Sequence, residues 1–267
     1  MLHNVTLKTL RDTGRALGWW SLGLVGLVAL IAGVFPTVRD NTQLNELAQN
    51  YPEAIKGLVS FGGVVDYTSG PGYLGSELFA FMVPLLFLVA AIGAGARAVA
   101  GEEERGTLDL LLALPLSRRR LVVEKLAALL GELLLLGIVL WLALVVAAPL
   151  VDLGVSAGHA AAAVLYVVAL AFAFGAIAVL VGAATGHRGR AIGITAALAV
   201  AGYLVNSLAS LVGVLDRIKE ASPFFHYAAT NPLQSGLEAG HLAFLLAVAA
   251  VAVIAAPFVF DRRDLAA

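Results

Sequence analysis

Six long apolar stretches dominate this sequence and set the first limit on its fold. Each has at least the roughly 20 residues that a helix rising 1.5 Å per residue needs to cross a hydrocarbon layer about 30 Å thick. The stretches are Ala16–Pro36, Glu77–Ala98, Leu121–Leu150, His159–Ala184, Ala191–Val214 and His241–Phe260. The sequence therefore predicts an all-α integral membrane protein with six transmembrane helices, arranged as a single transmembrane domain of residues 1–267.

The composition agrees with this fold class and excludes several functions. The residues are 60% hydrophobic and 13% charged, whereas a soluble domain has about 45–50% apolar and about 25% charged residues. A net charge of -1 leaves no basic surplus for nucleic-acid binding. The absence of cysteine excludes disulfides and thiolate sites, and the five histidines show no metal-ligand spacing. We therefore expect neither a metal site nor catalysis on this chain.

Basic residues gather on one side of the predicted spans and set their orientation. Positive charge is retained on the cytoplasmic side of a membrane. With both termini in the cytoplasm, thirteen of the 17 basic residues are inside: Lys8, Arg11, Arg15, Arg97, Arg105, Arg118, Arg119, Arg120, Lys125, Arg188, Arg190, Arg262 and Arg263. Arg39, Lys56, Arg217 and Lys219 are outside. Both termini are predicted to be cytoplasmic, and the first apolar stretch, too long for a signal peptide, is interpreted as a retained span.

The connections between the spans carry further expectations. Residues 1–15 suit a helix on the inner surface, with a frayed basic flank as the alternative. In the extracellular segment 37–76, apolar residues recur at helical spacing between Leu44 and Val59, which favours one or two amphipathic outer helices over a plain linker. A second extracellular segment covers residues 215–240, and residues 261–267 form a cytoplasmic tail.

The inner connection Gly101–Lys125 differs most from an ordinary loop. Three acids open it, and Leu108, Leu111 and Leu112 then fall on one helical face before a proline. Ser117 is a good N-cap for the next helix. Cations in the first turn of that helix oppose its macrodipole, and Arg120 can pair with Glu124 at i,i+4. The sequence therefore predicts a short amphipathic helix, in a segment of residues 99–120, whose apolar face needs a partner.

This segment resembles the signature of ABC-2-type transporter permeases of the short, one-domain kind. The shared pattern is an acidic cluster, Arg, GTL, an acidic residue, LLL, a spacer, Pro, an apolar residue, Ser and a basic run ahead of Lys. The residues that match are Glu102, Glu103, Glu104, Arg105, Gly106, Thr107, Leu108, Asp109, Leu111, Leu112, Pro115, Arg118, Arg119 and Arg120. The likeness extends to Tyr51–Ala54, Gly72–Leu74, Ser222–Phe224 and Asp261–Leu265, and to Asn231–Leu233, where Asn231 takes a place at which Asp is common.

The resemblance implies a membrane subunit that is driven by separate ATP-binding subunits. The matching residues would couple the spans to an ATPase, and the family mostly exports. The chain has no GxxxxGK[ST] loop, so ATP and Mg²⁺ are expected on the partner and no cofactor on this chain. The expected complex contains two permease subunits, as a homodimer or heterodimer, and two ATPase subunits in a cell membrane.

Two sets of polar residues inside the spans remain open in function. Tyr203, Asn206, Ser207 and Ser210 share a helical face that could line a pathway or a dimer seam, or make ordinary hydrogen bonds between helices. Glu132, near the inner interface, could form a structural ion pair with Arg97 or take part in transport. A sensor or scaffold that keeps the docking helix, and an interfacial membrane enzyme, are the alternatives to a transporter.

Overall fold

The computed structural model describes residues 5–41, 43, 50, 66–108 and 117–263. In this part of the chain all regular structure is helical, as predicted. Six helices are long and apolar enough to cross a membrane. They are α2 (Gly14–Arg39), the run Gly70–Ala98 that ends in α6 (Met82–Ala98), α9 (Arg118–Leu150), α10 (Ala157–Thr185), α11 (Arg188–Leu208) and α15 (Ala239–Arg262).

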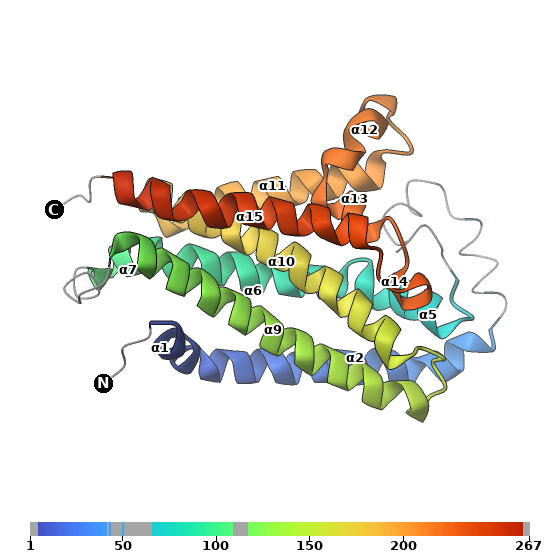
Figure 1. Ribbon diagram of the computed structural model, residues 1–267. Helices are drawn as coiled ribbons and strands as arrows, with labels where there is room; N and C mark the ends of the chain where they lie inside the picture. The colour runs from blue at the N-terminus through green and yellow to red at the C-terminus, as the bar shows by residue number, and fades with distance from the viewer. Residues whose placement is uncertain (1–4, 42, 44–49, 51–65, 109–116, 264–267) are drawn as a thin grey trace.

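The six helices form one elongated bundle, with both chain ends at the same end of it (Figure 1). This terminal end also carries α1 (Val5–Asp12) and α7 (Ala100–Glu104). The opposite end carries the remaining short elements, which are α5 (Gly70–Leu74), α12 (Gly213–Ile218), the 3₁₀ turn η2 (Lys219–Ala221), α13 (Pro223–Ala228) and α14 (Pro232–Ser235). An even number of spans returns the chain to the end at which it started.

The spans differ from the predicted ranges at two places. The second begins earlier than expected, with α5 and a π-helical turn η1 (Gly75–Phe79) ahead of α6. The fifth ends at Leu208 and not at Val214, because Val212 is extended and a new helix starts at Gly213. Ser210 therefore lies beyond the fifth span, and its predicted place on a shared helical face with Tyr203 is wrong. The predicted outer helices between residues 44 and 59 lie outside the described residues.

Helix α10 forms the centre of the bundle and packs on α6, α9, α11 and α15. Its contact with α6 is the closest, because a Cβ added at Gly95 would lie 2.3 Å from the carbonyl oxygen of Gly175. On the other side of that contact, a Cβ at Gly175 would lie 3.2 Å from the Cβ of Ala91. In a membrane, where burial of apolar surface drives association weakly, such small residues let helices associate by close van der Waals contact.

Tyrosine hydroxyls connect the helices at the opposite end of the bundle. Tyr227 donates a 2.7 Å hydrogen bond to the carbonyl of Phe79, and Tyr73 donates one of 3.0 Å to Ile31. Tyr166 donates a 2.7 Å bond to the carbonyl of Glu238. Phe79 is the last residue of a π-helical turn and Glu238 is the N-cap of α15, so two of these bonds lie where the regular backbone pattern is interrupted.

A pair of histidines also joins α13 to α15 at this end. The Nδ1 atoms of His226 and His241 are 3.0 Å apart, and His226 Nε2 contacts the carbonyl oxygen of Glu220 at 2.8 Å. A carbonyl can only accept, so Nε2 of His226 carries the proton and a neutral His226 accepts from Nδ1 of His241. Burial lowers the pKa of His226, and the charge of His241 lowers it further.

We predict that Gly95→Ala destabilises the bundle by at least about 1–3 kcal/mol, because the added methyl meets backbone and cannot be relieved by a rotamer change. The thermal unfolding midpoint of the purified protein in detergent measures this. Gly26→Ala is the matched control, since a Cβ at Gly26 has open space around it. Equal midpoints for the two variants would contradict the close approach of α6 and α10.

The histidine pair predicts a stability that falls with acid. A group whose pKa is lowered by folding stabilises the fold above its unfolded pKa, about 6.5 for histidine, and loses that contribution as the pH drops. We expect the unfolding midpoint to fall between pH 7.5 and pH 5.5, and His226→Gln to reduce this dependence. His187→Gln, at an exposed position of the terminal end, is the control and should leave the pH dependence intact.

Candidate functional site

The segment with the family-like motif begins at the terminal end, directly after α6. Helix α7 ends at Glu104, and a Schellman cap follows it, in which the Gly106 amide bonds the carbonyl of Glu103 at 2.9 Å and the Thr107 amide that of Glu102 at 2.9 Å. Gly106 has φ = +65°, which only glycine adopts without strain. The glycine and threonine of the motif are therefore explained by a helix cap.

This cap corrects one expectation. The acids Glu102–Glu104 belong to α7, which ends before Leu108. They therefore do not form the first turn of the amphipathic helix predicted for the leucines. Leu108 itself is 4% exposed and packs in the core of this chain. The remaining predicted coupling residues Asp109, Leu111, Leu112 and Pro115 lie outside the described residues.

Glu102 is held by residues of its own chain. Its carboxylate accepts hydrogen bonds from Lys125 Nζ at 2.8 Å and from Thr107 Oγ1 at 2.5 Å, and Arg105 lies 3.6 Å away. Burial raises the pKa of Glu102, but the bonds from Lys125 and Thr107 outweigh burial and hold the pKa below its usual value. Glu102 is therefore a half-buried anion that fixes α7 to α9.

Glu103 and Glu104 connect α7 to three other helices. Glu103 pairs with the guanidinium of Arg263, which also donates a 3.0 Å bond to the carbonyl of Ala183 at the end of α10. Glu104 accepts a 2.8 Å bond from the backbone amide of Arg188, the first residue of α11. The three acids thus connect the start of the motif to the ends of α9, α10, α11 and α15.

The arginines in the first turn of α9 also have partners within the chain. Arg118 donates to the carbonyl of Arg263 at 3.1 Å, and Arg119 pairs with Asp261 at 2.8 Å and lies 4.7 Å from the centre of the Phe258 ring. The predicted Arg120–Glu124 pair is confirmed, at 2.9 Å. The predicted N-cap is confirmed as well, since Ser117 Oγ accepts from the amide of Arg120 at 3.2 Å. These contacts offset the unfavourable position of cations at a helix start.

The predicted N-terminal segment contains a helix, α1, which packs against α9, and its place on the inner membrane surface stays a prediction. The backbone amide of Val5 donates to Glu124 at 2.7 Å, and Thr6 Oγ1 donates to the carbonyl of Glu124 at 3.0 Å. Just after this helix, Thr13 Oγ1 donates to Glu132 at 2.8 Å. The sequence did not predict these hydrogen bonds of Thr6 and Thr13, because no local pattern connects residues about 119 positions apart.

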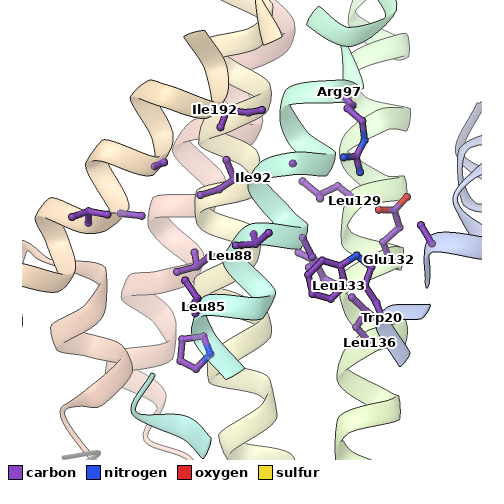
Figure 2. A pocket seen from close by; sticks show the side chains of 18 of the residues that line it. Trp20, Leu85, Leu88, Ile92, Arg97, Leu129, Glu132, Leu133, Leu136 and Ile192 are labelled. Atoms are coloured by element: carbon purple, nitrogen blue, oxygen red, sulfur yellow. The ribbon is translucent and has the colours of Figure 1, made fainter. Parts of the chain in front are cut away.

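An apolar groove of about 510 Å³ runs along α6, between α2 and α9 on one side and α11 on the other (Figure 2). Its walls carry aliphatic side chains such as Leu85, Leu88 and Leu133, together with Trp20. Arg97 and Glu132 point into the hollow from α6 and α9, as Figure 2 shows. Within the described residues these two side chains attract each other electrostatically but lie beyond the 4.0 Å of an ion pair, so the structure does not form the expected pair.

The polar residues predicted for the fifth span lie in different surroundings. Tyr203 lines the groove and contacts the rings of Phe81 and Phe224, with centroids 6.0 and 5.6 Å away. Ser207 is buried, and Asn206 is half-buried. Only Tyr203 of the four predicted residues is placed to face the groove.

The fold and this site define a class of protein. The chain is a polytopic helical membrane protein with an apolar groove between its spans and a dense ionic cluster at the terminal end. A sequence profile described as ABC-2 family transporter protein matches residues 4–265. The chain belongs to this family, as its motif indicated, and it is a permease-type membrane component of an ABC transporter. No curated protein is similar enough in sequence to count as a relative.

The cluster around Arg263 predicts how firmly α7 is held. Arg263→Gln removes the cation that joins Glu103 to α10, and leaves a partly buried carboxylate unpaired. We expect the amides of Gly106 and Thr107 to exchange with deuterium at least about fivefold faster, since a loss of about 1–3 kcal/mol of local stability raises opening by that factor or more.

Hydrogen exchange followed by mass spectrometry on the full-length protein in detergent makes this measurement. Arg262→Gln is the matched control, because Arg262 is the exposed neighbour of Arg263. Unchanged exchange in the Arg263 variant would show that the cluster does not stabilise the cap.

Proposed function

We propose that this chain is the permease subunit of an ATP-driven exporter. It would work as a dimer of permeases with two separate ATP-binding subunits in the cell membrane, with both termini in the cytoplasm. ATP and Mg²⁺ would bind on the partner subunits. The observation that carries the proposal is the ionic cluster, because it connects the family motif directly to the ends of four spans.

The terminal end is the side that suits an ATPase. All thirteen basic residues expected in the cytoplasm belong to described elements or connections at this end, which also carries α1 and α7. A force applied to the segment after Gly106 would reach α9 through Lys125, α10 and α15 through Arg263, and α11 through the amide of Arg188. Ion pairs and rigid helices of this kind are the physical means by which two sites become coupled.

The docking contact itself falls on the leucines after the cap. Leu108 is already buried by this chain, so the apolar surface that a partner would cover is assigned to Leu111 and Leu112 by their helical spacing in the sequence. Glu102 and Glu103 are also engaged internally, and we assign them to transmission and not to contact with the ATPase.

The groove along α6 supports the role of a pathway. It is open on one side, and apolar with few polar groups, as sites for hydrophobic cargo are. A second permease subunit facing it would close the groove into a chamber, with Tyr203 in its wall. Direction of transport rests on the family alone.

We predict that the double substitution Leu111→Asp with Leu112→Asp removes a separate P-loop ATPase from the complex. Burying two carboxylates in an apolar contact costs more than about 2 kcal/mol, so we expect at least about a tenfold loss of retained ATPase. Affinity purification from native membranes in mild detergent, with quantitative mass spectrometry of the retained proteins, makes the measurement.

The matched control is Val214→Asp, which places the same charge on an exposed apolar residue at the opposite end of the bundle. It should retain near-equimolar ATPase. Recovery of the folded, unsubstituted chain without any ATPase, under conditions that preserve other membrane complexes, would contradict the proposed function and favour a sensor or scaffold.

A further inference from the structure

A second hollow adjoins the apolar groove at the terminal end. This vestibule, of about 470 Å³, lies between α1, the end of α6, α7 and α9. It is lined mainly by charged and polar side chains, among them Lys8, Asp12 and Arg105. The two hollows share four lining residues, Thr13, Arg97, Leu129 and Glu132. A charged compartment therefore opens onto an apolar one at a junction made by these four residues.

Most charges near the junction are already paired. Glu102 is bound by Lys125 and Thr107, and Glu132 accepts the hydrogen bond of Thr13. Arg97 differs from them, because within the described residues its guanidinium has no acid within 4.0 Å and no hydrogen-bond acceptor. Glu132 attracts the guanidinium of Arg97 electrostatically but lies beyond 4.0 Å, so the guanidinium has no counter-ion in direct contact.

Arg97 is exposed at the terminal end of the groove, and its guanidinium folds back along α6. A Cβ added to Gly93, one turn earlier in α6, would lie 3.3 Å from Arg97 Nη1, so the side chain folds back along its own helix. Side chains of a helix lean toward its N-terminus, which for α6 is the opposite end of the bundle. Figure 2 shows the guanidinium pointing from α6 toward Leu129 and Glu132 of α9, with Leu133, Leu136 and Trp20 following along the same side of the hollow.

We propose that the junction binds the head group of an anionic membrane amphiphile, with Arg97 as its counter-ion and the acyl chain along the apolar groove. A guanidinium presents parallel donors that match a phosphate or carboxylate. The groove provides apolar wall for the chain along α9, at Leu133 and Leu136, with Trp20 of α2 beside them. The inference rests on the proposed function, because it names the substrate class that such a permease would accept.

Charge complementarity selects this occupant over a second copy of the chain. A protein face that covered the groove would shield the guanidinium of Arg97 from water without giving it a hydrogen-bond acceptor, which is costly. A neutral lipid would have the same shortcoming. An amphiphile with an anionic head supplies the counter-charge and the apolar body in one molecule.

Trp20 lines the groove and can report on its occupancy. The chain has three tryptophans, so Trp19→Phe with Trp141→Phe leaves Trp20 as the reporter. The full-length permease in a neutral detergent is titrated with a monoacylglycerol phosphate whose acyl chain carries bromine, which quenches tryptophan at contact. The same brominated monoacylglycerol without phosphate is the matched neutral probe.

We expect the phosphate probe to quench Trp20 saturably, at a concentration at least about tenfold lower than the neutral probe, since a charge-assisted bond contributes at least that factor. Unbrominated monoacylglycerol phosphate should reverse the quenching. Arg97→Gln should abolish the difference between the probes, Arg97→Lys should retain part of it, and Arg262→Gln should retain all of it. Circular dichroism and elution volume confirm that each variant is folded.

Equal quenching by the two probes overturns the proposal, as does a full phosphate preference in Arg97→Gln. If Arg97→Gln does not fold, the test is competition by unbrominated monoacylglycerol phosphate on the protein that keeps Arg97. Failure of this competitor to reverse the quenching overturns the proposal. Absence of quenching by both probes, together with a dimer in solution, would mean that a second copy fills the groove. No ATPase or flux is involved, so a failure here leaves the ATPase-retention test of the proposed function unaffected.

Discussion

The close contact between α6 and α10 is the constraint on which the other features depend. Gly95 and Gly175 bring these helices together at backbone distance, and α10 is then surrounded by α9, α11 and α15. Since lipid is as apolar as the helix surfaces, this packing has to come from shape, and glycine and alanine supply it. Much of the apolar wall of the groove is on the same helix as Gly95, and α7 begins directly after that helix, so the positions of both depend on this contact.

At the terminal end, ion pairs and charge-assisted hydrogen bonds hold the helices together. Acids of α7 are matched with a lysine of α9, an arginine after α15 and the first amide of α11. The pairs of Glu102 and Glu103 are partly shielded from water, so removal of one member leaves a poorly solvated charge. An assembly of this type moves as a unit, which is what the transmission of a conformational change from a bound ATPase requires.

Structure that depends on neighbouring residues could be predicted from the sequence, and contacts between residues far apart in the sequence could not. Ser117 and the Arg120–Glu124 pair act within four residues, and the apolar stretches are long, so caps, pairs and spans could be inferred. The Glu102–Lys125 and Glu103–Arg263 bonds join residues 23 and 160 positions apart, and composition cannot assign such partners. The end of the fifth span was missed because Val212 and Gly213 interrupt a stretch that stays apolar throughout. Arg97 and Glu132 were expected to form an ion pair, but both line the groove and lie more than 4.0 Å apart.

The bond from the amide of Arg188 to Glu104 has a consequence for how this family is compared. His187, at the start of α11, offers no side-chain cap, so a carboxylate from another helix takes that role and also faces the positive end of the helix dipole. Because the donor is backbone, any residue except proline at position 188 preserves the bond. Positions 104 and 188 should therefore show little covariation among homologues although they touch, and contact maps inferred from covarying positions would leave α7 detached from α11.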